Sequence, residues 1–190
     1  MLSVYLDIRA ETASEQSAAG RIRLGVSKGL GSSMIAPALK CFRESHPKID
    51  IDLIALSGFV SVPKRQADMS ILLTRPSSGL LKVRKCTDYS LQLYVARDYL
   101  EDSASIDSRA DLQNHTLIGY VDDLIYSSLL RYIDELLPGL TPHLYSPSIV
   151  AQLEMVTAGT GLGILPTFMA DRVPQLIPLL KSDISVTRSF

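Results

Sequence analysis

The feature that most constrains the fold is a regular alternation of strand-like and helix-like segments along the chain. Residues 21–26 alternate apolar and polar side chains, as a half-buried strand does. A Gly/Ser loop at 27–33 leads into a helix, and residues 49–56 have the pattern of the next strand. A short helix at 60–66 and a strand at 69–73 complete a β-α-β-α-β order. This order predicts a parallel sheet whose strands are connected by helices.

The helix that follows the Gly/Ser loop contains Pro37. Proline is tolerated in a helix only in the first turn or where the helix bends. We therefore expect this helix either to begin close to Pro37, after the loop, or to bend there. His46 and Pro47 should end it, because the residue before a proline avoids the helical region.

A second alternation follows two extended stretches, at 82–87 and 91–96, where the chain would leave its first lobe. Open parallel sheets bind ligands outside the carboxyl ends of their strands, so two successive α/β lobes would both present loops to a cleft. Beyond residue 96 we expect helices at 107–114, 124–137, 148–158 and 167–172 and strands at 116–120, 143–145, 163–165 and 184–187.

The charge and the apolar runs give no sign of a nucleic-acid or membrane surface. The 190 residues carry a net charge of −1, so no overall field attracts nucleic acid or an anionic membrane. No apolar run approaches the roughly 20 residues that cross a bilayer. The N-terminus lacks the basic and apolar regions of a secretory signal. We expect a cytoplasmic protein with no membrane partner.

Cysteine and histidine are sparse. Cys41 and Cys86 are too few and too far apart for a disulfide framework or a metal knuckle. The three histidines show no ligand spacing such as HExxH. We expect two reduced thiols, no metal and no cofactor.

Three stretches of sequence stand in a recognisable order. The first is G-R-I-R-L-G-V-S at 20–27, with I-A-P-A-L-K-C-F-R-E-S-H-P after the Gly/Ser loop. The second is A-D-M-S-I-L-L-T-R-P at 67–76, and the third is A-G-T-G-L-G-I-L-P at 158–166. Together they resemble the effector-binding domain of LysR-type transcription regulators over about residues 20–180.

The resemblance implies an α/β fold like that of type II periplasmic binding proteins, with two Rossmann-like lobes and a ligand cleft between them. The chain would cross between the lobes near Ala96 and again near Leu179. The implied parts are the tail of a linker helix at 1–19, the first lobe at 20–95 and 181–190, and the second lobe at 96–180.

The resemblance also implies partners. They are a small-molecule effector, expected to be a carboxylate, and a second copy of the chain in a homodimer or higher homo-oligomer. The family's winged helix-turn-helix would precede residue 1, and a final helix would follow S-V-T-R-S-F. We therefore expect DNA to be bound only through the missing N-terminal domain.

The family binds its effector at helix N-termini and strand ends around the cleft. Free backbone N–H groups and the helix dipole favour a small carboxylate there, and Arg75 could hold one through its planar fork. The alternative is that the serines only cap helices and that Arg75 is an ordinary surface residue. The candidate effector-binding residues are Ser27, Ser32, Ser33, Thr74, Arg75, Tyr120, Asp122 and Ser148.

Two other functions would use the same residues differently. Residues 25–29 match G-x-S-x-G between a strand and a helix, as in a serine hydrolase with Ser27 as nucleophile and His115 or His143 downstream. Only 24 residues precede this motif, which leaves no earlier strand for an oxyanion-hole loop. A solute-binding protein would share the fold but would need export. The glycine run at 159–163 lacks the spacing and lysine of a phosphate loop and should end a helix.

Overall fold

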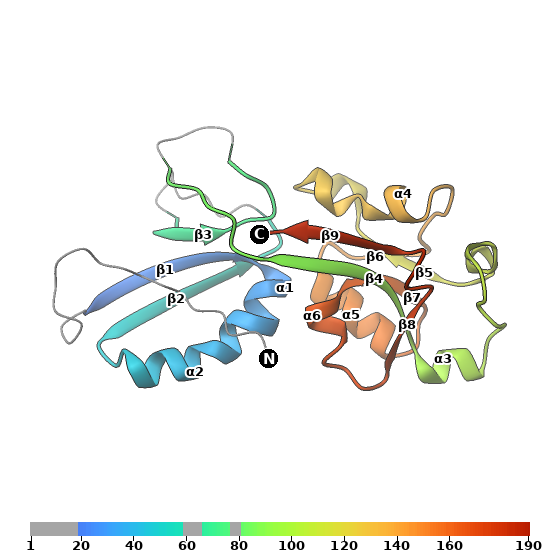
Figure 1. The fold of residues 1–190 in the computed structure, drawn as a ribbon, viewed down its shortest axis with the longest axis horizontal. Coiled ribbons are helices and arrows are strands. Elements are labelled where there is room, and N and C mark those ends of the chain that lie inside the picture. Colours follow the sequence, from blue (N-terminus) through green and yellow to red (C-terminus); the bar gives the residue numbers. More distant parts are fainter. Residues whose placement is uncertain (1–18, 59–65, 77–80) are drawn as a thin grey trace.

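Two β-sheets, each with helices beside it, lie next to one another along the long axis of the molecule (Figure 1). The computed structural model describes residues 19–58, 66–76 and 81–190. We call the smaller sheet and its helices the first lobe, and the larger sheet and its helices the second lobe. The expected α/β fold of two lobes is confirmed. The proposed linker-helix tail and nearly all of the helix predicted at 60–66 lie outside the described residues.

The first lobe is built on parallel strands in the order β2-β1-β3. The central strand β1 (Gly20–Ser27) pairs along its whole length with β2 (Ile49–Leu56), and its second half pairs with β3 (Met69–Ile71). Leu24 and Val26 of β1 point into the core, as their alternation predicts. The strand predictions for this lobe are confirmed, although β3 ends before residue 73.

The Gly/Ser stretch at 27–33, predicted to be a loop, is helical, so that prediction was wrong. A helical segment runs without a break through α1 (Lys28–Leu30), a π-helical turn (Gly31–Ile35) and α2 (Ala36–Ser45). Its glycines allow close packing and do not mark a loop. A Cβ on Gly31 would lie 2.7 Å from the Cβ of Ala55, so only glycine lets this turn pack tightly on β2.

Pro37 lies inside this helical segment and accounts for its wide turn. Proline has no N–H, so the carbonyl of Ser33, four residues earlier, loses its α-helical donor. Single π-turns occur where the regular hydrogen-bond ladder is interrupted in this way. The Arg172 side chain, from the second lobe, donates a hydrogen bond to the Ser33 carbonyl oxygen.

The second lobe has a mixed sheet in the order β6-β5-β7-β4-β8, and β9 also pairs with β4. β5 is parallel to β6 and β7, whereas β4 is antiparallel to β7, β8 and β9. β8 was not predicted, because Pro178 interrupts its pattern; an edge strand tolerates this proline. The strands are β4 (Asp88–Ala96), β5 (Leu117–Gly119), β6 (Leu144–Tyr145), β7 (Leu162–Pro166), β8 (Leu176–Leu179) and β9 (Ser185–Ser189).

The helices of the second lobe differ from the sequence patterns in three places: α3 (Arg97–Glu101) was not predicted, the helix expected at 107–114 is a 3-10 helix (Arg109–Asn114), and the helix expected at 124–137 is broken. Only α4 (Tyr132–Leu136) is α-helical there, and shorter 3-10 turns precede it. The hydroxyl of Ser127 accepts a hydrogen bond from the N–H of Leu129 at 3.3 Å, which starts a new turn and breaks the longer helix. The other helices are α3 (Arg97–Glu101), α5 (Ile149–Thr157) and α6 (Thr167–Ala170).

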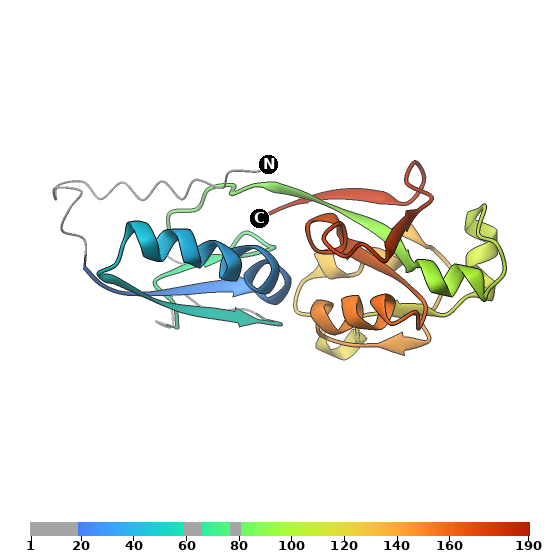
Figure 2. The same ribbon diagram turned by 90° about the horizontal axis from the view of Figure 1, so that it is seen from below.

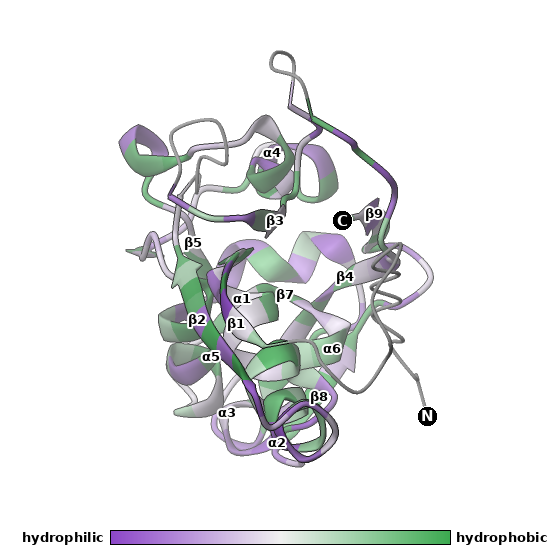
Figure 3. Ribbon diagram, turned by 90° about the vertical axis from the view of Figure 1, so that its left-hand side faces the viewer, coloured by the Kyte–Doolittle hydropathy of each residue, from purple (hydrophilic) through white to green (hydrophobic). Residues whose placement is uncertain are grey.

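Most of the hydrophobic core lies on the two faces of the second sheet. Leu93 and Ile164 belong to the cluster on one face, and Tyr94 and Leu165 belong to the cluster on the other. Hydrophilic residues lie mainly outside, for example on the outer side of α2 (Figure 3). The first lobe has a smaller core, made of Leu24, Val26, Leu30, Ile35 and Phe190. The second lobe is therefore the more extensively packed one.

The two lobes are joined by β4 and by the end of β9, which run on the same side of the molecule (Figure 2). β4 pairs with the second sheet from Asp88 onward, whereas the resemblance placed the first lobe boundary at residue 95. Phe190 reaches the core of the first lobe, and its N–H donates to the carbonyl of Thr87 at 2.9 Å. The connection is therefore a pair of hydrogen-bonded segments close to the molecular centre.

Candidate functional site

A cavity of about 40 Å³ lies between the lobes, at the carboxyl ends of the parallel strands of both sheets. Open α/β sheets place their ligand sites at these strand ends. The first turn of α1 also lines the cavity. The strand-end residues around it are Ser27 of β1, Ser57 after β2, Leu73 after β3, Tyr120 after β5, Pro147 after β6 and Pro166 of β7.

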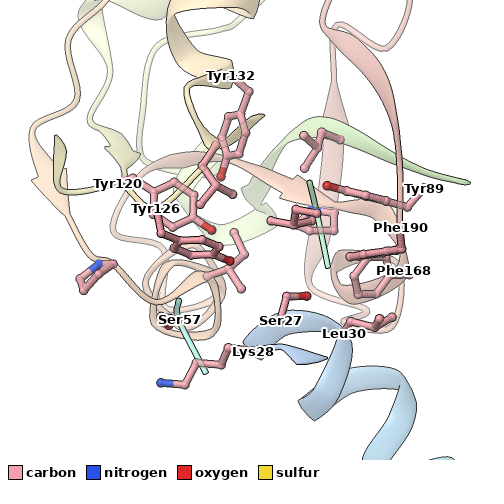
Figure 4. A pocket seen from close by; sticks show the side chains of 17 residues that line it. Ser27, Lys28, Leu30, Ser57, Tyr89, Tyr120, Tyr126, Tyr132, Phe168 and Phe190 are labelled. Carbon is pink, nitrogen blue, oxygen red and sulfur yellow. The ribbon is translucent and has the colours of Figure 1, made fainter. Parts of the chain in front are cut away.

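Aromatic side chains form two walls of the cavity (Figure 4). On one side, Tyr89 stacks on Phe190 with ring centroids 4.4 Å apart, and Phe168 meets Tyr89 edge to face. On the other side, Tyr120 and Tyr132 make an edge-to-face pair at 5.8 Å, and Tyr126 lies beside Tyr120. The site therefore offers ring faces with hydroxyl groups at their ends.

Tyr132 carries a buried hydroxyl that has no partner. The residue is 2% exposed, and its Oη has no hydrogen-bond partner within the described part of the chain. Its hydroxyl end points toward Tyr120 and the cavity (Figure 4). Burial raises the pKa of Tyr132 well above its usual value, and the Tyr120 phenol, which is close enough to interact with the Tyr132 hydroxyl but lies outside hydrogen-bond geometry, raises it further. Burial also raises the pKa of Tyr120, so both phenols stay neutral at physiological pH and can donate hydrogen bonds.

Ionised groups are scarce around the cavity. Lys28 is the one lining residue, among those described, whose side chain is charged at neutral pH. Its side chain extends away from the tyrosines (Figure 4). The Ser27 hydroxyl makes no capping hydrogen bond to the first helical turn, so it leaves those backbone N–H groups to another acceptor. These surroundings suit a neutral ligand, or a ligand with a single negative charge placed at the start of α1.

Contacts between the lobes keep the cavity narrow. Thr74 Oγ1 of the first lobe and Ser127 Oγ of the second are 2.7 Å apart and share a hydrogen bond. The hydrogen bond from Arg172 to the Ser33 carbonyl is a second link. Gly29 of α1 contacts the second lobe so closely that an added Cβ would lie 2.8 Å from Met169 Sδ. A ligand larger than the present cavity must separate these contacts.

Ser27 and Tyr120 are the predicted site residues that line the cavity. Each stands at the end of a parallel strand, and this position is the reason why it was predicted as a site residue. Thr74 lies next to the lining residue Leu73, and its hydroxyl is engaged by Ser127. Their positions at the ends of strands therefore bring these three residues to one region of the molecule.

Ser32, Ser33 and Arg75 lie outside the cavity lining. Both serines were placed at a helix start, but the helix begins at Lys28, which leaves them inside the π-helical turn. Ser32 is exposed there. Arg75 is also exposed and makes no hydrogen bond or ion pair with the described residues.

Asp122 and Ser148 lie beside the site but do not line it. Asp122 is exposed, and its carboxylate is 3.7 Å from the guanidinium of Arg131. Ser148 is the N-cap of α5, and its hydroxyl accepts a hydrogen bond from the N–H of Ala151 at 3.4 Å. The alternative prediction, that the serines cap helices, therefore holds for Ser148.

Sequence reasoning missed the aromatic walls. They come from β4, from the loop before α4, from α4 itself, from α6 and from the last residue, which share no spacing in the sequence. The available signal was weak: the chain has eight tyrosines and no tryptophan, and several tyrosines follow the predicted strand end at residue 120.

The histidines that a hydrolase would need lie away from Ser27. His115 is buried, and its Nδ1 is 3.2 Å from the hydroxyl of Tyr99. His143 Nδ1 accepts a hydrogen bond from the N–H of Leu117 at 3.2 Å. Neither is among the residues that line the cavity. Ser27 thus has no general base beside it in the described parts of the chain.

Neither a metal centre nor a membrane-crossing helix is present among the described residues. No cluster of three or more histidine, cysteine or carboxylate side chains is arranged to hold a metal ion there. None of the helices described is long and apolar enough to cross a membrane.

Two α/β lobes around a shared cavity define the fold class, which is that of the type II periplasmic binding proteins. The family model described as LysR substrate binding domain matches residues 15–189. The chain therefore belongs to the LysR substrate-binding domain family, and the resemblance stated from its motifs is confirmed.

Known relatives agree with this assignment. The chain is 26% identical over 171 residues to the HTH-type transcriptional regulator MetR of Salmonella typhimurium, which covers 87% of this chain and 53% of MetR. The chain thus spans about half the length of the curated relatives it matches.

Solved structures of regulatory domains share the fold. The regulatory domain of CrgA, a LysR-type regulator from Neisseria meningitidis, matches with a TM-score of 0.79 and 21% identity over 91% of this chain and 87% of that one. Full-length AphB, the Vibrio cholerae virulence activator, matches with a TM-score of 0.69 and 20% identity over 92% of this chain and 61% of AphB.

Proposed function

We propose that this chain senses a small-molecule effector between its lobes and, as part of a LysR-type regulator, passes the lobe movement to a DNA-binding domain. Transcription would respond to the effector in the cytoplasm. The observation that carries this proposal is the convergence of strand ends from both sheets on one cavity. A ligand that touches both lobes stabilises the lobe arrangement that it fits best.

The proposed effector is a small carboxylate. The backbone N–H groups in the first turn of α1 belong to residues that line the cavity, and they receive no capping bond from the Ser27 hydroxyl. Such groups, with the helix dipole, favour one negative charge. The support from charged side chains is limited to Lys28, since Arg75 lies outside the lining.

The proposed role is binding without catalysis. The similar proteins are regulators, and Ser27 has no histidine beside it among the described residues. We also propose that the chain works as a homodimer or higher homo-oligomer, with DNA bound through a separate domain. Light scattering at micromolar concentration should give a mass above that of one chain, and a clean monomer would contradict the assembly.

A melting-temperature screen with a library of small carboxylates tests the proposal, because a ligand that binds only the folded state raises stability with its concentration. Ser27→Ala and Tyr120→Phe should reduce the shift, since both residues line the cavity. Ser32→Ala and Arg75→Ala are matched controls outside it and should leave the shift unchanged. A shift that responds to the controls but not to the lining variants would place the site elsewhere.

A further inference from the structure

We propose that the effector is a single-ring aromatic monocarboxylate with a second polar group, and that Tyr132 donates a hydrogen bond to that group. This inference rests on the proposed function and narrows its ligand class. The carboxylate would lie at the first turn of α1, and the ring would lie between the aromatic walls.

The walls of the cavity favour an aromatic ring. Tyr89, Phe168 and Phe190 pack as one aromatic group on one side, and Tyr120 and Tyr132 pack as another on the opposite side. Flat rings pack well against such faces and edges, with an attraction beyond simple burial of apolar surface. A flexible polar ligand without a ring would not make equivalent contacts with these aromatic side chains.

The hydroxyl of Tyr132 points to a second polar group on the ligand. It is buried and has no partner among the residues described, and it faces the cavity. Buried donors in native proteins are nearly always paired, so an unpaired donor at a cavity wall indicates a missing acceptor. Because the phenol is neutral, it can donate to a hydroxyl or carbonyl oxygen of a ligand.

The charge of the lining limits the ligand to one negative charge. Lys28 carries the one positively charged side chain and no aspartate or glutamate is present in the described lining, so a dicarboxylate would bury a charge without a partner. An ammonium group would meet no acidic side chain there. A single carboxylate can use the backbone N–H groups in the first turn of α1.

The size of the cavity favours a small ligand. The present volume is about 40 Å³, whereas a cavity that takes up benzene measures about 150 Å³. Even one ring therefore requires the lobes to part, which would break the hydrogen bond between Thr74 and Ser127. A larger ring system would require a correspondingly larger separation.

Isothermal titration calorimetry of the full chain with benzoate, 3-hydroxybenzoate and 4-hydroxybenzoate tests the proposal. At least one hydroxybenzoate should bind about fivefold more tightly than benzoate, as expected for one added hydrogen bond. Tyr132→Phe should remove this preference, so that benzoate and the hydroxybenzoates bind the variant with similar affinity. Tyr145→Phe, at an exposed tyrosine outside the cavity, should preserve it. Cyclohexanecarboxylate, succinate and benzylamine should bind more weakly than benzoate.

Equal affinity of the wild-type chain for benzoate and both hydroxybenzoates would overturn the role of Tyr132, even if the variant did not fold. Equal binding of cyclohexanecarboxylate and benzoate would overturn the aromatic class. If no aromatic carboxylate binds but the library yields another ligand that depends on Tyr120, the class fails and the proposed function stands. If nothing in the library binds, both fail.

Discussion

Replacing Tyr132 by phenylalanine should stabilise the ligand-free protein, although the change removes a group from its interior. The hydroxyl is buried and has no hydrogen-bond partner in the described parts of the chain. A buried donor left unsatisfied costs about 1–3 kcal/mol. Phenylalanine keeps the edge-to-face contact with Tyr120, and the void left by one oxygen costs no more than about 1 kcal/mol. The free energy of unfolding should therefore rise by about 1 kcal/mol.

Tyr94 provides the matched control, because it is equally buried but its hydroxyl has a partner. It is 0% exposed and donates to the Asp171 carboxylate at 2.6 Å. Tyr94→Phe deletes a hydrogen bond to a charged acceptor, which contributes about 1.5–3 kcal/mol. Asp171 is exposed, so water can replace the lost donor. We expect a loss of stability of about 1.5 kcal/mol, at the lower end of that range.

Urea unfolding and thermal melting of both variants measure the two effects. For a chain of this size, 1 kcal/mol corresponds to a melting-point change of about 2–4 °C. The two substitutions should move the melting point in opposite directions. If Tyr132→Phe lowers the free energy of unfolding by as much as Tyr94→Phe does, the Tyr132 hydroxyl has a partner in the folded protein. The argument that it awaits a ligand would then be refuted.

Three further changes test other parts of the structure. Arg172→Ala removes a hydrogen bond between the lobes at an exposed position, so it should lower the free energy of unfolding by only about 0.5 kcal/mol but widen the cleft. An unchanged radius of gyration in small-angle scattering would contradict this. Gly161→Ala should cost about 1–3 kcal/mol, because the new Cβ overlaps the main-chain carbonyl oxygen of Thr116. Gly58→Ala, with no atom of the described residues within 4 Å of the new Cβ, is its control, and equal melting points would disprove the overlap. Burial raises the pKa of Tyr89 to about 12 from 10, so the unfolded chain ionises first. Its contribution to stability should persist below pH 10 and be lost toward pH 12, and urea unfolding that stays constant over that range would contradict the shift.

The general position of the cavity could be predicted because it follows from strand direction alone. Parallel strands end at the same edge of a sheet, so Ser27 and Tyr120, at the ends of two predicted strands, both reach the cavity. The alternation of strands and helices also predicted the two-lobed fold before any side-chain contact was known.

The residues that give the site its chemistry could not be predicted because they meet only through tertiary packing. Tyr89 lies on a connecting strand and Phe190 ends the chain, yet their rings stack at 4.4 Å. The helix start was misplaced for a related reason. Gly29 and Gly31 suggest a loop by propensity, whereas their lack of a side chain is what allows α1 to approach the second lobe and β2.

The proposed site between the lobes can be tested most directly by locking the lobes together. Thr74→Cys and Ser127→Cys would place two thiols where the hydroxyls are now 2.7 Å apart, with Cys41→Ser and Cys86→Ser removing the exposed native thiols. The ligand is the library compound that gives the largest melting-point shift, and binding is measured with and without reductant. We expect the oxidised, narrow form to bind it poorly, because its cavity is only about 40 Å³, and the reduced form to bind normally. Unchanged affinity in the oxidised form would contradict a ligand site between moving lobes.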